Sequence, residues 1–434
     1  MHPFGTPYWW DDGKPLPDLP ESPPRTAELV IVGGGYTGLS AAITATRAGA
    51  KVTVIDAIIP GQGASTRNGG MCGAHTRIAI DDMAASFGRG TAHDLLNEAP
   101  KAYAFTRDLI EAEAIACDFQ ETGRIVVSCT KAKQAEMAAM AAGMKNLSGY
   151  GLEEVPRNRM AEHIATDAYA GGFLYRDHGG LHPRKFHDGL MEIALNEGVT
   201  VVQNCPVVDV KGREGAFEIS TKNGAIRAEK IILATNGYTK KPFSGLSRRV
   251  FPLPSFIIAT EPLDADTLNR LAPGRRMMVE TRARHSYYRI SPDGSRIIFG
   301  GRAGMVPYGP ELAARRLKAT MVGIWPELAD VKITHSWRGN TGFTFEQMPH
   351  VGKFDGLHAA FGYSGSGVAM APYLGMKVAY QALGDARGET AFSRTTPTTR
   401  VYHPGGHPLF LAAGELWYRQ VVDRIESRKA RKDR

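Results

Sequence analysis

The chain has 434 residues, of which 43% are hydrophobic and 22% are charged. This composition is typical of a folded globular protein and excludes a fully disordered chain, and no apolar run approaches the roughly 18–20 residues of a membrane-spanning helix. The formal net charge is +8, but half of it comes from residues 419–434, where seven basic residues outnumber three acidic ones by four. We therefore expect no nucleic-acid partner and no stable membrane insertion. A solvated helix end is the simplest interpretation of the basic tail, and contact with a membrane surface or with nucleic acid is the alternative.

The first 26 residues are rich in proline and acidic residues and lack an apolar core. They predict an extended arm and not a secretory signal. Tyr8, Trp9 and Trp10 are the exception, and we expect them to pin the arm onto the folded body. The four cysteines are scattered without the spacing of a zinc site or a redox dithiol, so no metal is expected. Four thiols suit a reducing compartment, and we expect a cytoplasmic protein.

A βαβ unit follows the arm. Residues 28–32 form an apolar, β-branched run that predicts a buried parallel strand. Residues 39–48 predict a helix of small side chains, and residues 51–55 predict a second strand. The whole unit takes about 30 residues, which is the length of a dinucleotide-binding unit.

The turn inside this unit has the sequence Gly33-x-Gly35-x-x-Gly38. Gly33 permits the tight turn, Gly35 lets a pyrophosphate approach the backbone, and Gly38 lets the helix lie close to the strand. The phosphates would lie at the helix N-terminus, where unpaired N–H groups and the dipole favour anions. Asp56 closes the second strand, where its carboxylate would accept from a ribose hydroxyl and repel a 2′-phosphate.

The rest of the chain alternates between helical and strand patterns without an internal repeat. We expect Ala-rich helices at 82–145, broken by a strand at 123–129. Strands are expected within 200–235, with a hairpin turn at Asn223-Gly224, and at 252–301, with a hairpin turn at Pro292-Asp293-Gly294. A strand at 357–361 and a helix at 368–383 follow.

Three further segments favour FAD over NAD. Loop 61–70 combines glycines with hydroxyl and amide side chains that can wrap phosphate and flavin edges. Residues 234–237 end a strand where the chain can return to the adenine side. Turn 362–367 opens a helix whose N–H groups can stabilise negative charge on a reduced flavin. A second GxGxxG, expected of a separate nicotinamide domain, is absent from the sequence.

At these residues the sequence resembles the D-amino-acid-oxidase-like FAD-dependent oxidoreductases, which include glycine and sarcosine oxidases, and among them the gamma-glutamylputrescine oxidase branch. The matching stretches are VIVGGGYTGLSAA, GASTRNGG, ILATNGY, WRGNTGFTFEQMPHVG and FGYSGSGVAMAPYLG. The resemblance implies oxidation of the C–N bond of an amine or amino acid by hydride transfer to flavin N5. The imine product would hydrolyse, and oxygen or another acceptor would reoxidise the flavin.

The resemblance also implies an α/β fold in which a Rossmann-like FAD-binding domain of the glutathione-reductase type is interleaved with an α+β substrate domain on an antiparallel sheet. The expected boundaries are 1–26 for the arm, 27–85, 150–235 and 335–385 for the FAD-binding domain, 86–149 and 236–334 for the substrate domain, and 386–434 for a C-terminal extension with a basic helix.

The residues expected to contact FAD are those that match the family motifs. They are Gly33, Gly35, Tyr36, Thr37, Gly38, Asp56, Ala64, Ser65, Arg67, Asn68, Gly69, Gly70, Met71, Val207, Thr235, Gly237, Gly365, Ser366, Gly367 and Val368. Val207 falls where the family pairs backbone groups with adenine. The sarcosine-oxidase relatives tether the flavin to a cysteine near the last motif, but no cysteine follows Cys205. We therefore expect non-covalent FAD.

Hydride transfer from a neutral amine needs positioning and exclusion of water more than acid–base catalysis, so aromatic walls and a few polar anchors are expected. Tyr287 and Arg289 point to one face of a predicted strand and Tyr288 to the other. Trp337 is a candidate pocket wall, and His75 is a candidate to meet a carboxylate or activate oxygen. Sheet packing, core packing and a structural role are the respective alternatives.

Two other functions stay open. One is a flavin-binding electron-transfer subunit or dehydrogenase that passes electrons to a membrane or protein acceptor. The other is an NAD-dependent dehydrogenase. No GxSxG, HExxH or P-loop motif supports a hydrolase or a kinase. The expected partners are a small amine or amino acid and an electron acceptor, and a homo-oligomer is compatible with the sequence.

Overall fold

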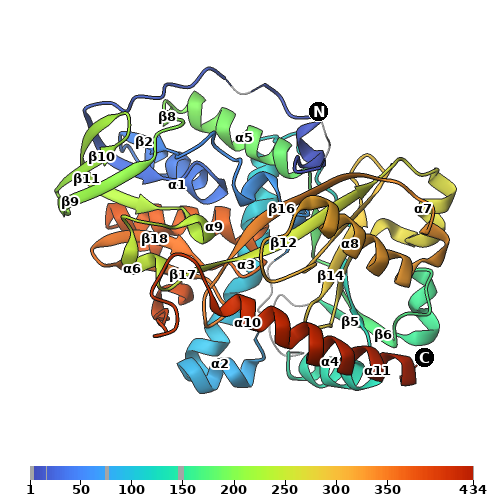
Figure 1. The fold of residues 1–434 in the computed structure, drawn as a ribbon. Coiled ribbons are helices and arrows are strands. Elements are labelled where there is room, and N and C mark those ends of the chain that lie inside the picture. The colour runs from blue at the N-terminus through green and yellow to red at the C-terminus, as the bar shows by residue number, and fades with distance from the viewer. Residues whose placement is uncertain (1–3, 16, 74–77, 145–150, 434) are drawn as a thin grey trace.

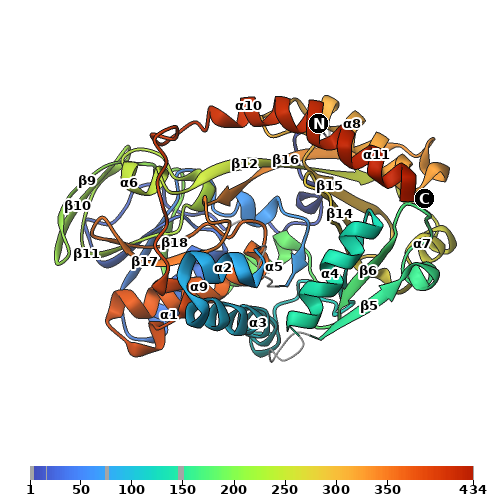
Figure 2. The same cartoon turned by 90° about the horizontal axis from the view of Figure 1, so that it is seen from below.

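A computed structural model describes residues 4–15, 17–73, 78–144 and 151–433. Two eight-stranded sheets organise this part of the chain, and a two-stranded sheet of β3 (Met71–Cys72) and β7 (Gly179–Gly180) lies apart from them. The two large sheets lie side by side, with helices packed around them (Figures 1 and 2).

The first sheet has the strand order β17-β18-β11-β1-β2-β8. Its strands are β1 (Thr26–Val32), β2 (Val52–Ile55), β8 (Thr200–Val202), β11 (Gly224–Leu233), β17 (His350–Phe354) and β18 (Leu357–Phe361), with β9 (Val207–Arg213) and β10 (Ala216–Thr221) continuing from β11. Strands β8, β2, β1, β11 and β18 are parallel neighbours, and β17 is antiparallel to β18. Parallel strands are covered on both faces, and the last four residues of β1 are all buried, as its unbroken apolar run predicts.

One layer of helices on this sheet is built around α1 (Tyr36–Arg47) and α9 (Gly367–Leu383), which pack closely. A Cβ on Gly375 would lie 2.4 Å from the Thr37 carbonyl oxygen, so only glycine allows the two helices this approach. The long helix α3 (Arg89–Ala112) and α5 (Pro183–Asn196) complete the same hydrophobic core.

The second sheet has the order β16-β12-β15-β14-β13-β4-β6-β5. Its strands are β4 (Arg124–Ser128), β5 (Leu152–Pro156), β6 (Gly171–Tyr175), β12 (Phe251–Thr260), β13 (Met277–Glu280), β14 (Ser286–Ile290), β15 (Ile297–Gly301) and β16 (Ile333–Phe343). All neighbouring pairs are antiparallel except β13 and β4. One face is covered by α8 (Pro310–Ile324) and α7 (Ala265–Leu271), whose apolar residues form a second core with the sheet.

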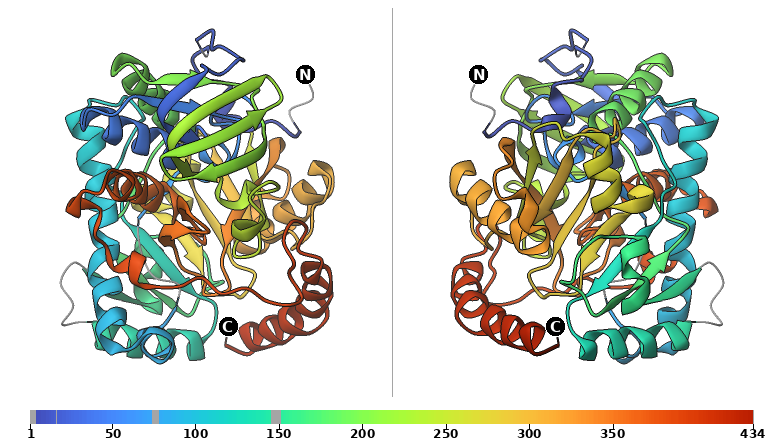
Figure 3. Two further views of the ribbon diagram at one scale, coloured as in Figure 1. Left: turned by 90° about the vertical axis from the view of Figure 1, so that its left-hand side faces the viewer. Right: turned by 90° about the vertical axis from the view of Figure 1, so that its right-hand side faces the viewer.

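The remaining helices lie at the edges of the molecule. They are α2 (Ile80–Phe87), α4 (Lys131–Met144), the short α6 (Ser244–Ser247), α10 (Phe410–Trp417) and α11 (Asp423–Asp433). A π-helical turn, η9 (Tyr418–Val422), joins α10 to α11, and the three form one helix along the outside of the molecule (Figure 3). Among the described residues, no helix combines the length and apolarity needed to cross a membrane.

The predicted α/β fold is confirmed, and the turn at Pro292-Asp293-Gly294 joins β14 to β15 as expected. The assignment of segments to the two units differs in three places. Helix α3, expected in the substrate unit, packs into the core of the first sheet, whereas β5 and β6, expected in the FAD-binding unit, belong to the second sheet. Strand β16 also pairs in the second sheet, with β12. Hydrophobic periodicity reveals which face of an element is buried but not which neighbour covers it, and that is the reason for these differences.

Candidate active site

A cavity of about 450 Å³ lies where the parallel strands of the first sheet end. Val32 of β1 pairs with Ile55 of β2 and with Leu233 of β11, so the three strands finish at one edge. The residues that follow them, Gly33, Asp56 and Ala234, all line the cavity. In parallel α/β sheets this edge is where ligands bind.

Two helices begin at this cavity. Helix α1 starts after Gly35 and α9 starts after Ser366, and neither helix has a side-chain N-cap. The first N–H groups of such helices need partners from outside the helix, and together with the dipole they favour an anion. One of them is satisfied, because the Tyr36 N–H donates to Ser65 Oγ at 3.0 Å.

The glycines of the turn fit a pyrophosphate. Gly33 has a φ of +110°, which side-chain-bearing residues rarely adopt, and a Cβ on Gly38 would lie 1.8 Å from the Gly33 oxygen. Gly35 lines the cavity directly. A Cβ on Gly35 would lie 2.7 Å from Ser65 Oγ and would occupy the space beside the turn that suits a pyrophosphate. The residues present therefore suit a dinucleotide whose phosphates lie against bare backbone.

Asp56 has a structural task as well as a place in the cavity wall. Its carboxylate accepts from the Gly34 N–H at 2.8 Å and from the Ile58 N–H at 3.1 Å. Burial raises the pKa of this carboxyl, and the two backbone hydrogen bonds oppose that rise. The side chain thus fixes the glycine turn, and the expected contact to a ribose hydroxyl stays a prediction.

A second cavity, of about 420 Å³, lies between the 64–71 loop and the second sheet. It shares wall residues with the first cavity, namely Ala64, Asn68, Thr341, Gly365 and Val368. The two cavities therefore meet at the loop and at the start of α9. A molecule in the second cavity would reach the end of a dinucleotide held in the first.

The second cavity is rich in positive charge. Its described wall residues with acidic or basic side chains are four arginines, one glutamate and one histidine: Arg67, Arg124, Arg282, Arg302, Glu280 and His285. Glu280 already accepts from the Tyr169 hydroxyl at 2.9 Å and from the Ser286 N–H at 3.2 Å. The charge excess favours a ligand that carries a carboxylate.

Tyr287 lines this cavity, as expected for a substrate-side residue. Its hydroxyl lies 2.8 Å from Ser255 Oγ, and burial raises its pKa to about 12, so the phenol is protonated at neutral pH. Its ring fits because Gly300 lies opposite it on β15: a Cβ on Gly300 would be 2.3 Å from the ring.

Arg289 does not line either large cavity. It is buried, and its guanidinium donates to the carbonyl oxygens of Gly70 at 2.8 Å, Leu181 at 3.2 Å and Ile290 at 3.1 Å. Burial lowers its pKa to about 10. Arg289 lies on the same face of β14 as Tyr287, as the strand alternation predicts. The 70–71 and 179–181 segments cover Arg289, so it supports the 64–71 loop and is separated from the cavity.

Trp337 is not the pocket wall that we expected. It is 1% exposed, and its Nε1 donates to the Arg67 carbonyl oxygen at 2.9 Å. Phe343, further along β16, is the residue of this strand whose ring reaches the cavity wall. Trp337 therefore holds the 64–71 loop and does not form the pocket wall. His75 lies outside the described residues.

Most of the residues expected at the cofactor line the first cavity. They are Gly33, Gly35, Tyr36, Thr37, Asp56, Ala64, Ser65, Asn68, Val207, Thr235, Gly365, Gly367 and Val368. Arg67, Gly69 and Met71 line the second cavity. Gly38, Gly70 and Gly237 lie behind the walls, where close backbone contacts exclude a Cβ.

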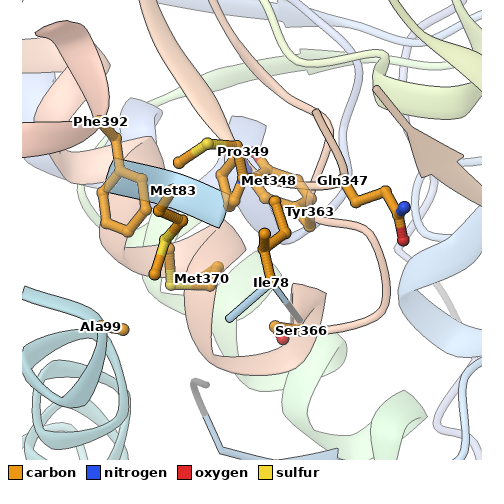
Figure 4. A pocket seen from close by; sticks show the side chains of 10 residues that line it. All are labelled: Ile78, Met83, Ala99, Gln347, Met348, Pro349, Tyr363, Ser366, Met370 and Phe392. Carbon is orange, nitrogen blue, oxygen red and sulfur yellow. The ribbon is translucent and has the colours of Figure 1, made fainter. Parts of the chain in front are cut away.

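Ser366 points to a different, smaller space. It lines a cavity of about 20 Å³ together with Tyr363 and Met370 of the α9 region and with Ile78 and Met83 (Figure 4). This volume is close to that of one water molecule and the walls are mostly apolar, which excludes it as a substrate site.

The N-terminal arm binds the same loop from outside, which confirms that its aromatic residues pin it to the body. Trp9 is fully buried and donates from Nε1 to the Asn68 carbonyl oxygen at 2.8 Å. Trp10 donates from Nε1 to Thr66 Oγ1 at 2.8 Å, and the Arg67 guanidinium lies 4.6 Å from the centre of its ring. The arm and Trp337 thus fix a loop that lines both cavities.

We expect the variant Trp9→Phe/Trp10→Phe to bind FAD about 30-fold more weakly, because each of the two lost hydrogen bonds to the loop costs about 1 kcal/mol. Titration of the apoprotein with FAD measures this. Trp325→Phe is the matched control, since Trp325 is 2% exposed and its Nε1 has no hydrogen-bond partner among the described residues. Unchanged FAD affinity in the double variant would show that the arm does not order the loop.

Several wall residues were not predicted from the sequence, among them Arg124, Arg302 and Ser255. Arg124 lies on β4 and Arg302 directly follows β15, and they come from segments far apart in the chain. The guanidinium of Arg302 lies 5.2 Å from the centre of the Phe343 ring. The one sequence signal was the Gly300-Gly301 pair before Arg302, because glycine within a strand marks a close approach.

The sheet edge, the two uncapped helices and the bare glycine turn define a dinucleotide-binding protein of the α/β class. The family model described as FAD dependent oxidoreductase (DAO) matches residues 28–381. The chain belongs to this family, which confirms the predicted family and FAD as the cofactor.

Two curated relatives and one solved structure illustrate the family. The probable oxidoreductase OrdL of Rhizobium meliloti strain 1021 is 32% identical over 388 residues, covering 88% of this chain and 90% of that protein. Gamma-glutamylputrescine oxidoreductase of Escherichia coli K12 is 30% identical over 408 residues, covering 92% and 93%. The crystal structure of glycine oxidase from Geobacillus kaustophilus superposes with a TM-score of 0.71 at 18% identity, covering 87% of this chain and all of that one.

Proposed function

We propose that the protein oxidises the C–N bond of an amine or amino acid to an imine, which then hydrolyses. The observation that carries this proposal is the junction of the two cavities at Ala64, Asn68 and Gly365. The names of the similar gamma-glutamylputrescine oxidoreductase and glycine oxidase support the substrate class.

The residues of the first cavity would hold FAD. Gly33 and Gly35 and the N-terminus of α1 suit its pyrophosphate, and Val207 lies at the end where we expect adenine. FAD supplies a two-electron acceptor that takes a hydride from the substrate carbon. The uncapped start of α9 would favour negative charge beside it.

The second cavity would hold the substrate. Tyr287, Tyr175 and Phe343 form apolar walls that exclude water, and the protonated Tyr287 hydroxyl can donate a hydrogen bond. Arg124 and Arg302 would bind a carboxylate, which favours an amino acid over a simple amine. Fixed walls and one ion pair supply the positioning that hydride transfer requires.

We also infer that FAD is not covalently attached. Cys72 lies outside both cavities, and burial raises the pKa of its thiol far above the usual range, so it is a poor nucleophile. Cys205 does line the first cavity, but its N–H donates to the Asp56 carbonyl oxygen at 2.7 Å, which places it at the ribose end. All four cysteines are free and buried, which supports a reducing, cytoplasmic location.

An anaerobic screen tests the proposed reaction. The purified holoenzyme should absorb near the flavin band, and that band should bleach when an amine or amino-acid substrate is added without oxygen. We expect the strongest bleaching with substrates that carry a carboxylate. A flavin that is reduced by none of a broad set of amines and amino acids, but by a reduced electron-transfer protein or a quinol, would favour the electron-transfer function instead.

A further inference from the structure

The C-terminal helix has an outer face that lines neither of the two large cavities. The helix runs from Phe410 to Asp433, about 36 Å at 1.5 Å per residue, along the outside of the molecule (Figures 1 and 3). Among the described residues, nine large hydrophobic side chains are exposed, and six of them lie between Val401 and Ile425. Single exposed apolar residues are ordinary, but such a concentration marks a contact surface.

The inner face of this helix is held by its acidic residues. Glu415 is 6% exposed and accepts from the Met305 N–H at 2.7 Å and from the Arg284 guanidinium at 3.3 Å. Further inward bonds join Asp423 to Arg284, Glu426 to the Ala283 N–H at 3.1 Å, and Asp433 to the Lys131 N–H at 2.8 Å. The helix is therefore fixed against the protein, and the acids cannot neutralise its outer face.

The outer face divides into an apolar half and a basic half. In the first half Leu409, Leu416 and Trp417 are 81%, 65% and 60% exposed. Val401 and Tyr402 lie next to this half, since the Tyr402 ring packs 5.3 Å from the ring of Phe410. In the second half the exposed basic side chains are Arg424, Arg428, Lys429, Arg431 and Lys432, which make no ion pair with any described residue.

We propose that this face docks the protein on the surface of an anionic phospholipid bilayer. Leucine and tryptophan side chains enter the headgroup region when a helix lies in the plane of the membrane, and arginine and lysine bind the lipid phosphates. The arrangement fits an anionic surface better than a second copy of the chain, because a paired copy would bring two basic halves into the same interface.

Vesicle co-sedimentation of the holoenzyme tests this inference. We expect binding to vesicles of equal parts phosphatidylglycerol and phosphatidylcholine, and none to phosphatidylcholine alone. The variant Arg424→Gln/Arg428→Gln/Arg431→Gln should bind about 100-fold more weakly, because each cation near an anionic surface contributes about fivefold. Leu416→Ser/Trp417→Ser should also lose binding.

The matched control removes three exposed cations from the β9–β11 region, as Arg213→Gln/Lys222→Gln/Arg227→Gln. It should bind like the unchanged protein, and all variants should keep their flavin and their substrate-dependent bleaching. Absence of vesicle binding, equal binding to both lipid mixtures, or equal losses in the control and tail variants would overturn the inference. So would light scattering that shows a dimer dissociated by Leu416→Ser/Trp417→Ser, because the face would then join two copies.

Discussion

The variant Gly35→Val is expected to purify as a folded protein without flavin. Gly35 precedes α1 and lines the first cavity, and its missing side chain leaves the space in which a pyrophosphate would lie. Added methyl groups would occupy that space and separate the phosphates from the helix N–H groups. We expect the affinity for FAD to fall more than about 100-fold, since several charge-assisted hydrogen bonds are lost together.

Flavin absorbance per protein and an FAD titration of the apoprotein measure this loss. Gly90→Ala is the matched control, because Gly90 lies in α3 and a Cβ there would meet no atom within 4 Å. Circular dichroism should be native for both variants. A Gly35→Val protein with full flavin content would refute the placement of the pyrophosphate at this turn.

The variant Arg302→Gln is expected to lower kcat/KM for amino-acid substrates about 10- to 100-fold. Arg302 lines the second cavity, and a hydrogen-bonded ion pair with a substrate carboxylate contributes about 1.5–3 kcal/mol. Glutamine keeps much of the side-chain length but removes the charge and the forked donor geometry. The flavin content should not change, because Arg302 does not line the first cavity.

Steady-state rates with paired substrates separate charge recognition from general damage. An amine that lacks a carboxylate should react equally well with Arg302→Gln and the unchanged enzyme. Arg315→Gln, which removes an exposed cation on α8, should leave both rates unchanged. Equal losses for the charged and the uncharged substrate would contradict carboxylate binding by Arg302.

The cofactor half of the site was largely predictable, because it depends on local requirements of the backbone. Gly33 adopts a positive φ, Gly38 lies against the Gly33 carbonyl, and Gly35 lies at a cavity wall. Each of these backbone requirements acts within a few residues of the chain, so the spacing of the glycines in the sequence is enough to predict it. The strand before this turn and the helix after it were predictable for the same reason.

The walls of the second cavity were less predictable, because they come from separate strands. Tyr287 was found through strand alternation, but the same alternation also selected Arg289, which the 70–71 segment covers. Trp337 looked like a wall residue and instead donates to Arg67. Arg124 and Arg302 carried no motif, and only the pairing of the strands brings them to one cavity.

The sequence by itself determined the βαβ unit, the family and FAD as the cofactor, since these depend on short segments whose glycines and apolar residues must occupy particular positions. The tertiary structure decided which sheet β5, β6 and α3 join, which arginines face the second cavity, and that the arm holds the 64–71 loop. It also separated the acidic inner face of the C-terminal helix from its basic outer face. These features depend on contacts between residues far apart in the chain, and a linear pattern shows which side chains are buried or charged but not what they meet.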